Sequence, residues 1–286
     1  ASHSGEPLQR ERVLAMLGAA GLTEEYLQCG THVPRHTESY HELVRAGKPL
    51  TPVYCNCSGK HAGMLVTAVH MNEDPRTYDK PEHPVQQRIL DAISRYCDVP
   101  AERIETATDG CGVPVHRLPL RAIALGYARL AAWSGAGRAA AYEDAAVGEN
   151  ADRFGNPPGS RSAAVKGRAA RAITSAMTAH PDMVAGRNRL DTDLMRAFRG
   201  RLFSKSGAEA VQCFGDLERG IGIAVKIEDG GSRALDAASM RVLELLGIGD
   251  ARIYAQLDAY RHPKIENMRG EQVGRIEAVF ELQAVN

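Results

Sequence analysis

The sequence shows no excess of either charge, no long apolar run and only a few cysteines. Its 286 residues include 35 Lys and Arg and 35 Asp and Glu, so the formal net charge at pH 7 is zero. Proteins that bind phosphate backbones or anionic membrane surfaces usually carry a surplus of positive charge. The apolar stretches at residues 123–133 and 240–248 are also shorter than the roughly 20 residues of a membrane-spanning helix. The composition therefore predicts neither nucleic acid nor membrane as a partner.

Cysteine is too sparse here to form the disulfide framework of a small secreted domain. The six cysteines stand at positions 29, 55, 57, 97, 111 and 213. We expect reduced thiols and a cytoplasmic protein, and we interpret Cys29, Cys97 and Cys213 as core residues. Because 44% of the residues are hydrophobic and 24% are charged, we expect a globular chain with a single domain over residues 1–286.

The spacing of apolar residues predicts an α+β fold. Helices are expected at residues 8–17, 85–96, 118–133, 163–179, 191–198 and 234–246. Strands are expected at residues 104–108, 201–204, 210–215 and 220–227. Residues 134–162 are rich in Gly, Ala, Asn, Pro and Arg, and we interpret them as a surface loop or insertion. Helices followed by an antiparallel meander and a returning helix indicate an antiparallel sheet packed against helices.

Two polar turns are the candidate functional sites. Residues 55–61 hold two thiols, a hydroxyl, an amine and an imidazole, and we expect an irregular turn that leads into a helix near residue 62. Cys111 stands between two glycines in the second turn. Two thiolates are a soft ligand pair that suits Zn²⁺. We therefore predict that Cys57 and Cys111 bind one metal ion.

The residues leave two alternatives for a third metal ligand. Lys60 coordinates only as a neutral amine, a form that burial beside a cation favours. His61 is the commoner type of zinc ligand.

Three other polar residues have both a structural and a catalytic interpretation. Lys205 lies where a predicted strand meets Ser and Gly, so it is either a solvated lysine or the lysine of a serine amidohydrolase, which accepts the serine proton or positions a carboxylate. Ser2 is either an ordinary serine near the end of the chain or the serine of such a site. Asp109 either caps its turn or orients the amine of a substrate.

Several common catalytic signatures are missing. The sequence has no zinc-protease helix motif, no deaminase signature, no phosphate-binding loop and no Gly-x-Ser-x-Gly elbow. Nucleotide binding and α/β-hydrolase chemistry therefore have no support.

Five polar motifs, in order along the chain, resemble the L-asparaginases of the Rhizobium etli type, also called thermolabile or class 3 asparaginases. The motifs are Ala-Ser-His-Ser-Gly-Glu at 1–6, Cys-Ser-Gly-Lys-His-Ala-Gly-Met at 57–64, Asp-Gly-Cys-Gly-Val-Pro at 109–114, Arg-Leu-Asp-Thr-Asp-Leu-Met at 189–195 and Ser-Lys-Ser-Gly-Ala-Glu-Ala at 204–210. The resemblance implies a fold like that of serine β-lactamases and glutaminases, a homodimer, and hydrolysis of the L-asparagine side-chain amide to L-aspartate and ammonia.

The resemblance also implies roles for individual residues. The zinc ligands would be Cys57, Lys60 and Cys111. The catalytic residues would be Ser2, Lys205 and Asp109, with His61 and Asp109 in contact with the substrate. The family carries a second serine–lysine pair in a Ser-x-x-Lys motif upstream of the first of these segments, so we expect an N-terminal segment to precede residue 1.

These roles lead to a mechanism of acyl transfer in two steps. A lysine-activated serine attacks the amide carbon, ammonia leaves, and water then hydrolyses the acyl-enzyme. One alternative is a zinc amidohydrolase in which the metal activates the attacking water and the serine only binds substrate. The other is an inactive fragment that binds asparagine.

Overall fold

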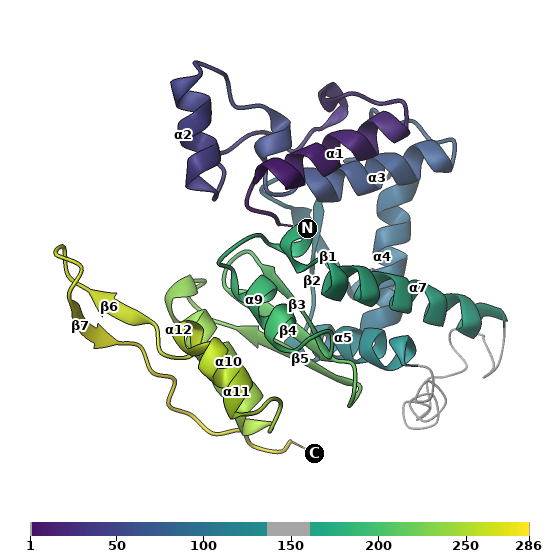
Figure 1. Ribbon diagram of the computed structural model, residues 1–286. Helices are drawn as coiled ribbons and strands as arrows, with labels where there is room; N and C mark the ends of the chain where they lie inside the picture. Colours follow the sequence, from purple (N-terminus) through teal and green to yellow (C-terminus); the bar gives the residue numbers. More distant parts are fainter. Residues whose placement is uncertain (1, 136–160, 286) are drawn as a thin grey trace. The chain divides into compact units, whose positions relative to one another are not determined.

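The computed structural model describes residues 2–135 and 161–285 (Figure 1). In these ranges helices are combined with small antiparallel sheets, so the predicted α+β class is confirmed. The residues form two compact units, one made of Ala1–Ala122 with Asp182–Arg187 and one made of Ile123–Pro181 with Asn188–Asn286. Most of the loop predicted at residues 134–162 lies outside the described residues.

The first unit is mainly helical. Its helices are α1 (Pro7–Ala19), α2 (Thr37–Arg45), α3 (Ser58–His70) and α4 (Pro84–Cys97), with 3₁₀ turns at Glu24–Tyr26, Pro52–Tyr54 and Ala101–Arg103. Its two strands, β1 (Glu105–Thr108) and β2 (Pro114–Arg117), form an antiparallel hairpin. Most of α8 (Pro181–Val184) also belongs to this unit. The helices predicted at residues 8–17 and 85–96 and the strand at 104–108 are therefore confirmed.

Helix α3 begins four residues earlier than the sequence predicts. We expected an irregular turn as far as residue 62, whereas the helix starts at Ser58. Ser and Gly are weak helix formers, but here tertiary contacts stabilise the first turn: the Ser58 hydroxyl donates to the Val53 carbonyl oxygen over 3.0 Å. Further along the helix, Ala62 and Leu65 are fully buried in the core of this unit. The polar motif at 57–61 is therefore fixed by a helix rather than carried on a loose turn.

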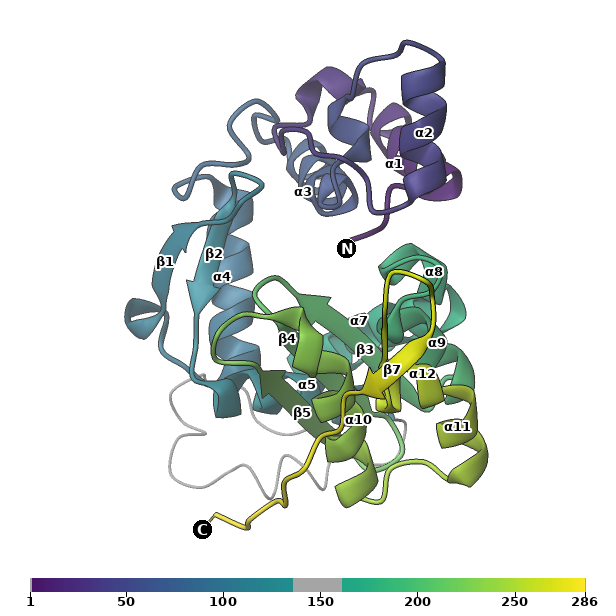
Figure 2. The ribbon, with the colours of Figure 1, turned by 90° about the vertical axis from the view of Figure 1, so that its left-hand side faces the viewer.

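The second unit is built on a three-stranded antiparallel sheet in the order β3-β4-β5 (Figure 2). The strands are β3 (Leu202–Gly207), β4 (Val211–Asp216) and β5 (Ile221–Lys226). The accompanying helices are most of α5 (Leu120–Ser134), α7 (Arg161–Ala179), α9 (Leu190–Ala197), α10 (Leu235–Leu245), α11 (Ala251–Gln256) and α12 (Asp258–Arg261), with a 3₁₀ turn at Ser232–Ala234. A separate hairpin joins β6 (Lys264–Glu266) and β7 (Gln272–Arg275). The meander and the helices predicted around it are confirmed, and the second hairpin was not predicted.

The two faces of this sheet contact different helices. Leu202, Phe214 and Ile223 share one face, where they join a core with residues of α9 and α10. On the other face a β-carbon added to Gly222 would lie 1.9 Å from the backbone oxygen of Ala124 in α5. Only glycine allows the strand and the helix to approach so closely.

None of the helices in the described ranges has both the length and the apolar character needed to cross a bilayer.

Candidate metal centre

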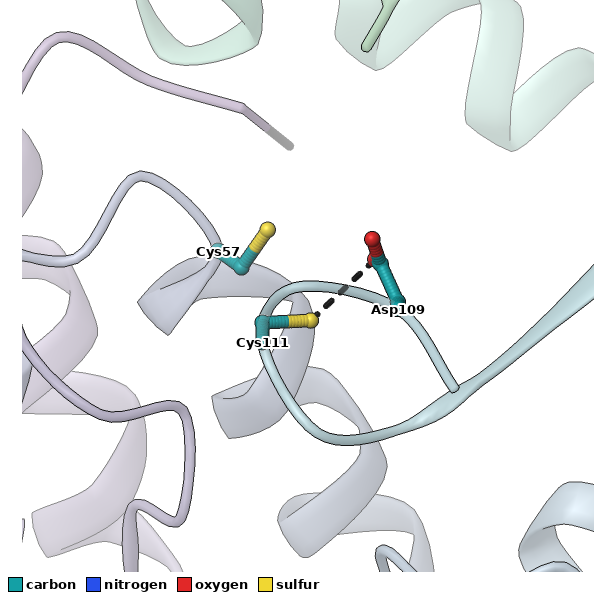
Figure 3. A group of neighbouring side chains, drawn as sticks. All are labelled: Cys57, Asp109 and Cys111. Atoms are coloured by element: carbon teal, nitrogen blue, oxygen red, sulfur yellow. Dashed lines mark hydrogen bonds between the residues drawn. The ribbon is translucent and has the colours of Figure 1, made fainter. Parts of the chain in front are cut away.

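The two polar turns predicted from the sequence meet in the first unit. Cys57 immediately precedes α3, and Cys111 lies in the turn between β1 and β2. In that turn the Asp109 backbone N–H donates to Val113, the Gly112 N–H donates to Asp109, and Gly112 has a φ of 90°. A sulfur of each cysteine and a carboxylate oxygen of Asp109 all lie within 4.8 Å of one another (Figure 3). Cys57, Asp109 and Cys111 therefore form a group that could hold a metal ion.

Asp109 accepts most of the hydrogen bonds within this group. Its Oδ2 accepts from the Lys60 ammonium at 2.8 Å and from the Cys111 thiol at 3.2 Å, and its Oδ1 accepts from the Gly110 N–H at 2.8 Å. Burial by itself would raise the pKa of Asp109, but Lys60 and Cys111 outweigh it and hold that pKa below its ordinary value. Burial by itself would lower the pKa of Lys60. The hydrogen bond from Lys60 to Asp109 outweighs burial, so the Lys60 pKa is raised. Without metal, the two residues form an ion pair.

The thiols of the group are protonated when no metal is bound. Contact with Cys57 and burial raise the pKa of Cys111 to about 12, although His61 and Lys60 act in the opposite direction. The Cys57 pKa is lowered by contact with Cys111, but Cys55 and burial outweigh that contact, and the result is a raised pKa. Because zinc binds thiolates, a metal entering this group must displace protons. Metal affinity is therefore expected to increase with pH.

The donor atoms present fit zinc. Zn²⁺ accepts sulfur, nitrogen and oxygen ligands in a tetrahedral arrangement. The group offers two sulfurs and one carboxylate, and the Lys60 amine touches that carboxylate. As a ligand, Lys60 would have to give up its proton and its ion pair with Asp109. Of the residues predicted as ligands, the structure thus brings Cys57 and Cys111 together with Lys60 beside them.

His61 follows Lys60 in the first part of α3. Its side chain is fully buried in α3, and its Nδ1 is 2.6 Å from the hydroxyl of Tyr78, which is itself fully buried. The other ring nitrogen, Nε2, is buried and has no hydrogen-bond partner among the described residues. His61 is one of the groups that oppose the rise in the Cys111 pKa, but the pKa remains raised.

Ser2 precedes a residue that is anchored to the first of the two turns. The His3 backbone N–H donates to the Asn56 carbonyl oxygen at 3.0 Å, and His3 Nε2 is 2.8 Å from the Ser58 hydroxyl. Gly5 N–H donates to His3 Nδ1, so Nε2 carries the proton and donates to Ser58. Since the Ser58 hydroxyl also donates its own proton to Val53, Ser58 has no base to activate it. Ser2 is partly exposed and lies one residue from this anchor.

Lys205 belongs to the second unit. It lies inside β3 rather than at a strand end, and its ammonium donates to the Ser206 carbonyl oxygen. Its charge helps to hold the pKa of the neighbouring Asp191 below the ordinary value, although burial acts in the opposite direction.

Asp191 was not singled out from the sequence. It is 1% exposed, and it accepts hydrogen bonds from Ser204 Oγ at 2.6 Å, Ser206 Oγ at 2.6 Å and Gln212 Nε2 at 2.7 Å. The strand sequences contain a pattern that could have indicated a buried polar partner such as Asp191. Ser204, Ser206 and Gln212 share the sheet face of Leu202 and Phe214, where polar residues need a buried partner.

The comparison with known families covers both units. Residues 1–278 match the family model described as L-asparaginase II. The matched range contains all seven candidate residues. No curated protein matches the chain.

Proposed function

The chain belongs to the L-asparaginase II family of the Rhizobium etli type, and we propose that it hydrolyses L-asparagine by serine–lysine acyl transfer beside a zinc ion. Family membership makes it an L-asparaginase, an amidohydrolase that releases ammonia from the substrate amide. The observation that carries the mechanistic proposal is the convergence of Cys57, Asp109 and Cys111 with Lys60, next to the segment that bears Ser2.

In this proposal Ser2 is the nucleophile and Lys205 is its partner. Lys205 accepts the serine proton or positions the substrate carboxylate, and Asp109 and His61 contact the substrate. The bond from Ser2 Oγ to the amide carbon forms, the carbon–nitrogen bond breaks with protonation of the leaving ammonia, and water then hydrolyses the ester to release aspartate. These roles follow the family resemblance. They are compatible with the finding that Ser58 is not the nucleophile, because its hydroxyl has no activating base.

Backbone donors for the oxyanion are available at the start of α3. The N–H groups of Gly59 and Lys60 belong to the first turn, which has no acceptors within its own helix. The Gly110 N–H is already bonded to Asp109 and is therefore a poorer candidate. One such donor contributes roughly 3 to 4 kcal/mol in comparable sites.

Zinc would be held by Cys57, Lys60 and Cys111, with Asp109 as a further oxygen donor within the same group. When bound, it supplies a positive charge that organises the site and polarises groups beside the substrate. Removal of the zinc ion is expected to slow turnover, but the serine and lysine would still carry out the acyl transfer.

We also propose further features that the family resemblance implies. These are a serine β-lactamase-like fold, a single asparaginase domain that includes both compact units, a homodimer and a cytoplasmic location. A three-stranded antiparallel sheet with helices on both faces supports the fold. The family match across both units supports the single domain, and the sparse cysteines support a reducing compartment.

The test is ammonia release from L-asparagine by the protein together with the Ser-x-x-Lys segment that the family resemblance implies. We expect Ser2→Ala and Lys205→Met each to lower kcat/KM by at least about 10³-fold. When residues act as one catalytic unit, removing one member costs nearly as much activity as removing all of them. Lys226→Met is the matched control, since this strand lysine donates to backbone oxygens near a turn, and it should retain full activity.

Cys57→Ser and Cys111→Ser separate the two mechanisms. Serine–lysine transfer predicts a residual rate in these variants. Full activity in Ser2→Ala, together with total loss in Cys57→Ser, would instead establish a hydrolase in which zinc activates water. Asparagine binding with no ammonia release from the wild type would leave only a binding protein.

A further inference from the structure

The Asp191 carboxylate bonds to the residues on both sides of Lys205 in strand β3. Its Oδ1 accepts from the Ser204 hydroxyl at 2.6 Å. Its Oδ2 accepts from the hydroxyl and from the backbone N–H of Ser206, at 2.6 and 3.0 Å. Ser204 and Ser206 directly precede and follow Lys205 in the chain. One carboxylate therefore fixes both neighbours of the lysine.

The same carboxylate connects helix α9 to two strands. α9 lies beside β3, which is the outer strand in the order β3-β4-β5 (Figure 1). From β4, the Gln212 Nε2 donates to Asp191 Oδ1 and to the Ser204 hydroxyl, both at 2.7 Å. Asp191 is 1% exposed and Ser204 is fully buried. Because unpaired donors are costly at this depth, the connection resists displacement.

Lys205 is linked to this network through Ser206. Side chains alternate along a strand, so Lys205 points to the sheet face opposite to that of its two neighbours. Its ammonium donates to the Ser206 carbonyl oxygen, while the N–H of the same serine donates to Asp191. The position of the ammonium therefore depends on how Asp191 holds Ser206. Burial alone would raise the Asp191 pKa, but the Lys205 charge and the hydrogen bonds hold that pKa below its ordinary value.

We propose that Asp191 is a positioning residue of this L-asparaginase, and that it acts through Lys205 by fixing the strand residues on both sides of it. The inference rests on the role of Lys205 in the proposed function. Asp191 is too deeply buried to contact the substrate. Supporting contacts of this kind hold catalytic groups within about 0.5 Å of the productive geometry.

Asp191→Asn tests the inference with little change of shape. The amide has one acceptor oxygen and an NH₂ group that can only donate, so it cannot accept all the bonds that the carboxylate accepts. Displacement of a reacting group by about 1 Å can slow a reaction roughly 100-fold. We therefore expect kcat/KM for L-asparagine to fall about 10- to 100-fold, measured by ammonia release below the onset of thermal unfolding of each variant.

Asp216→Asn is the matched control. Asp216 is also a buried carboxylate of this sheet, and it accepts from the backbone N–H groups of Glu218 and Arg219 at 2.9 and 3.0 Å. It lies opposite Leu202, at the other end of β3 from Lys205. Its replacement should destabilise the sheet but leave kcat/KM unchanged. A comparable loss of kcat/KM in Asp216→Asn would show that any weakening of the sheet lowers activity, and would overturn the proposal.

A double-mutant cycle tests whether Asp191 acts through Lys205. In the Lys205→Met background the lysine has already been lost, so adding Asp191→Asn should lower kcat/KM by no more than about 2-fold, since residues that act as a unit are not additive. An equal loss in both backgrounds would show a purely structural role and would overturn the proposal. Full activity of Lys205→Met would overturn the proposed function as well, whereas a large loss in Lys205→Met with an additive effect of Asp191→Asn would overturn this inference alone.

Ser204→Ala provides the same test if Asp191→Asn does not fold. Ser204 is fully buried, so its hydroxyl affects turnover only through the strand. Its removal deletes one bond to Asp191 and leaves both bonds from Ser206 in place. We expect a smaller loss of kcat/KM than in Asp191→Asn, and no further loss in the Lys205→Met background. Unchanged kcat/KM in every variant of this network that folds would overturn the proposal.

Discussion

Replacement of Asp191 should produce a large loss of stability in the second unit. The carboxylate is 1% exposed and accepts hydrogen bonds from Ser204, Ser206 and Gln212, all between 2.6 and 3.0 Å. It connects α9 to strand β3, which carries Lys205. Asp191→Ala would leave four donor contacts without their acceptor, two of them buried and two partly buried.

The size of the effect follows from these contacts. A hydrogen bond to a charged group contributes about 1.5 to 3 kcal/mol, and the values are not additive. Removing one partner of a buried charged network costs about 3 to 5 kcal/mol. We expect a loss in that range for Asp191→Ala and about 2 kcal/mol for Asp191→Asn, which keeps one acceptor oxygen. Asp193→Asn is the control, because Asp193 is 31% exposed and accepts from Tyr260, and it should cost at most about 1 kcal/mol.

Urea unfolding followed by the fluorescence of the single tryptophan measures this loss. Trp133 lies in the part of α5 that belongs to the second unit, so its signal reports on the same unit as Asp191. The folded-state pKa of Asp191 is below its ordinary value. The stability that its ionised form contributes is therefore present above about pH 4 and is lost as the pH falls further. A change below about 1 kcal/mol at neutral pH, or a difference between wild type and variant that grows in acid, would refute this reasoning.

Three further predictions concern single residues. Gly222→Ala should destabilise the protein by about 3 kcal/mol because its β-carbon would meet the backbone of α5, whereas Gly18→Ala in α1, with nothing within 4 Å, should leave thermal unfolding unchanged or slightly improved. Burial lowers the pKa of His3 to about 4, so wild-type stability should fall by up to about 3 kcal/mol from pH 6.5 to pH 4, and His3→Gln should reduce this slope in pH-dependent unfolding. In Lys60→Met the pKa of Asp109 should rise, since the ion pair that lowers it is lost; a side-chain ¹³C NMR titration that finds it unchanged would contradict the assigned pair.

Periodicity in the sequence was enough to predict several of the regular elements, but not helix α2 or strand β2. In helix Pro7–Ala19 the apolar residues Val13 and Leu17 are buried four residues apart on one face, whereas Leu8 and Leu14 are exposed. Strands β3 to β5 contribute Leu202, Phe214 and Ile223 to the core. The start of α3 was missed because its stability comes from contacts of Ser58 with Val53 and His3 rather than from local propensity. The short hairpin β6–β7 was missed because its residues are largely exposed and show no apolar alternation.

The candidate site was predictable only where chemistry is local in the sequence. Cys57 and Lys60 lie together in one motif, and the chemistry of thiols suggested that Cys111 joins them. The central place of Asp109 depends on the geometry of the β1–β2 turn, and the contact between His61 and Tyr78 depends on tertiary packing. Neither has a signature in the spacing of residues.

Zinc K-edge X-ray absorption on zinc-loaded protein tests the central claim most directly. The account predicts two sulfur neighbours at about 2.3 Å with nitrogen or oxygen completing the shell, and the loss of one sulfur in Cys57→Ser and of one in Cys111→Ser. A shell made only of nitrogen and oxygen at about 2.0 Å, or one that is unchanged in both variants, would contradict a metal centre shared by these two cysteines.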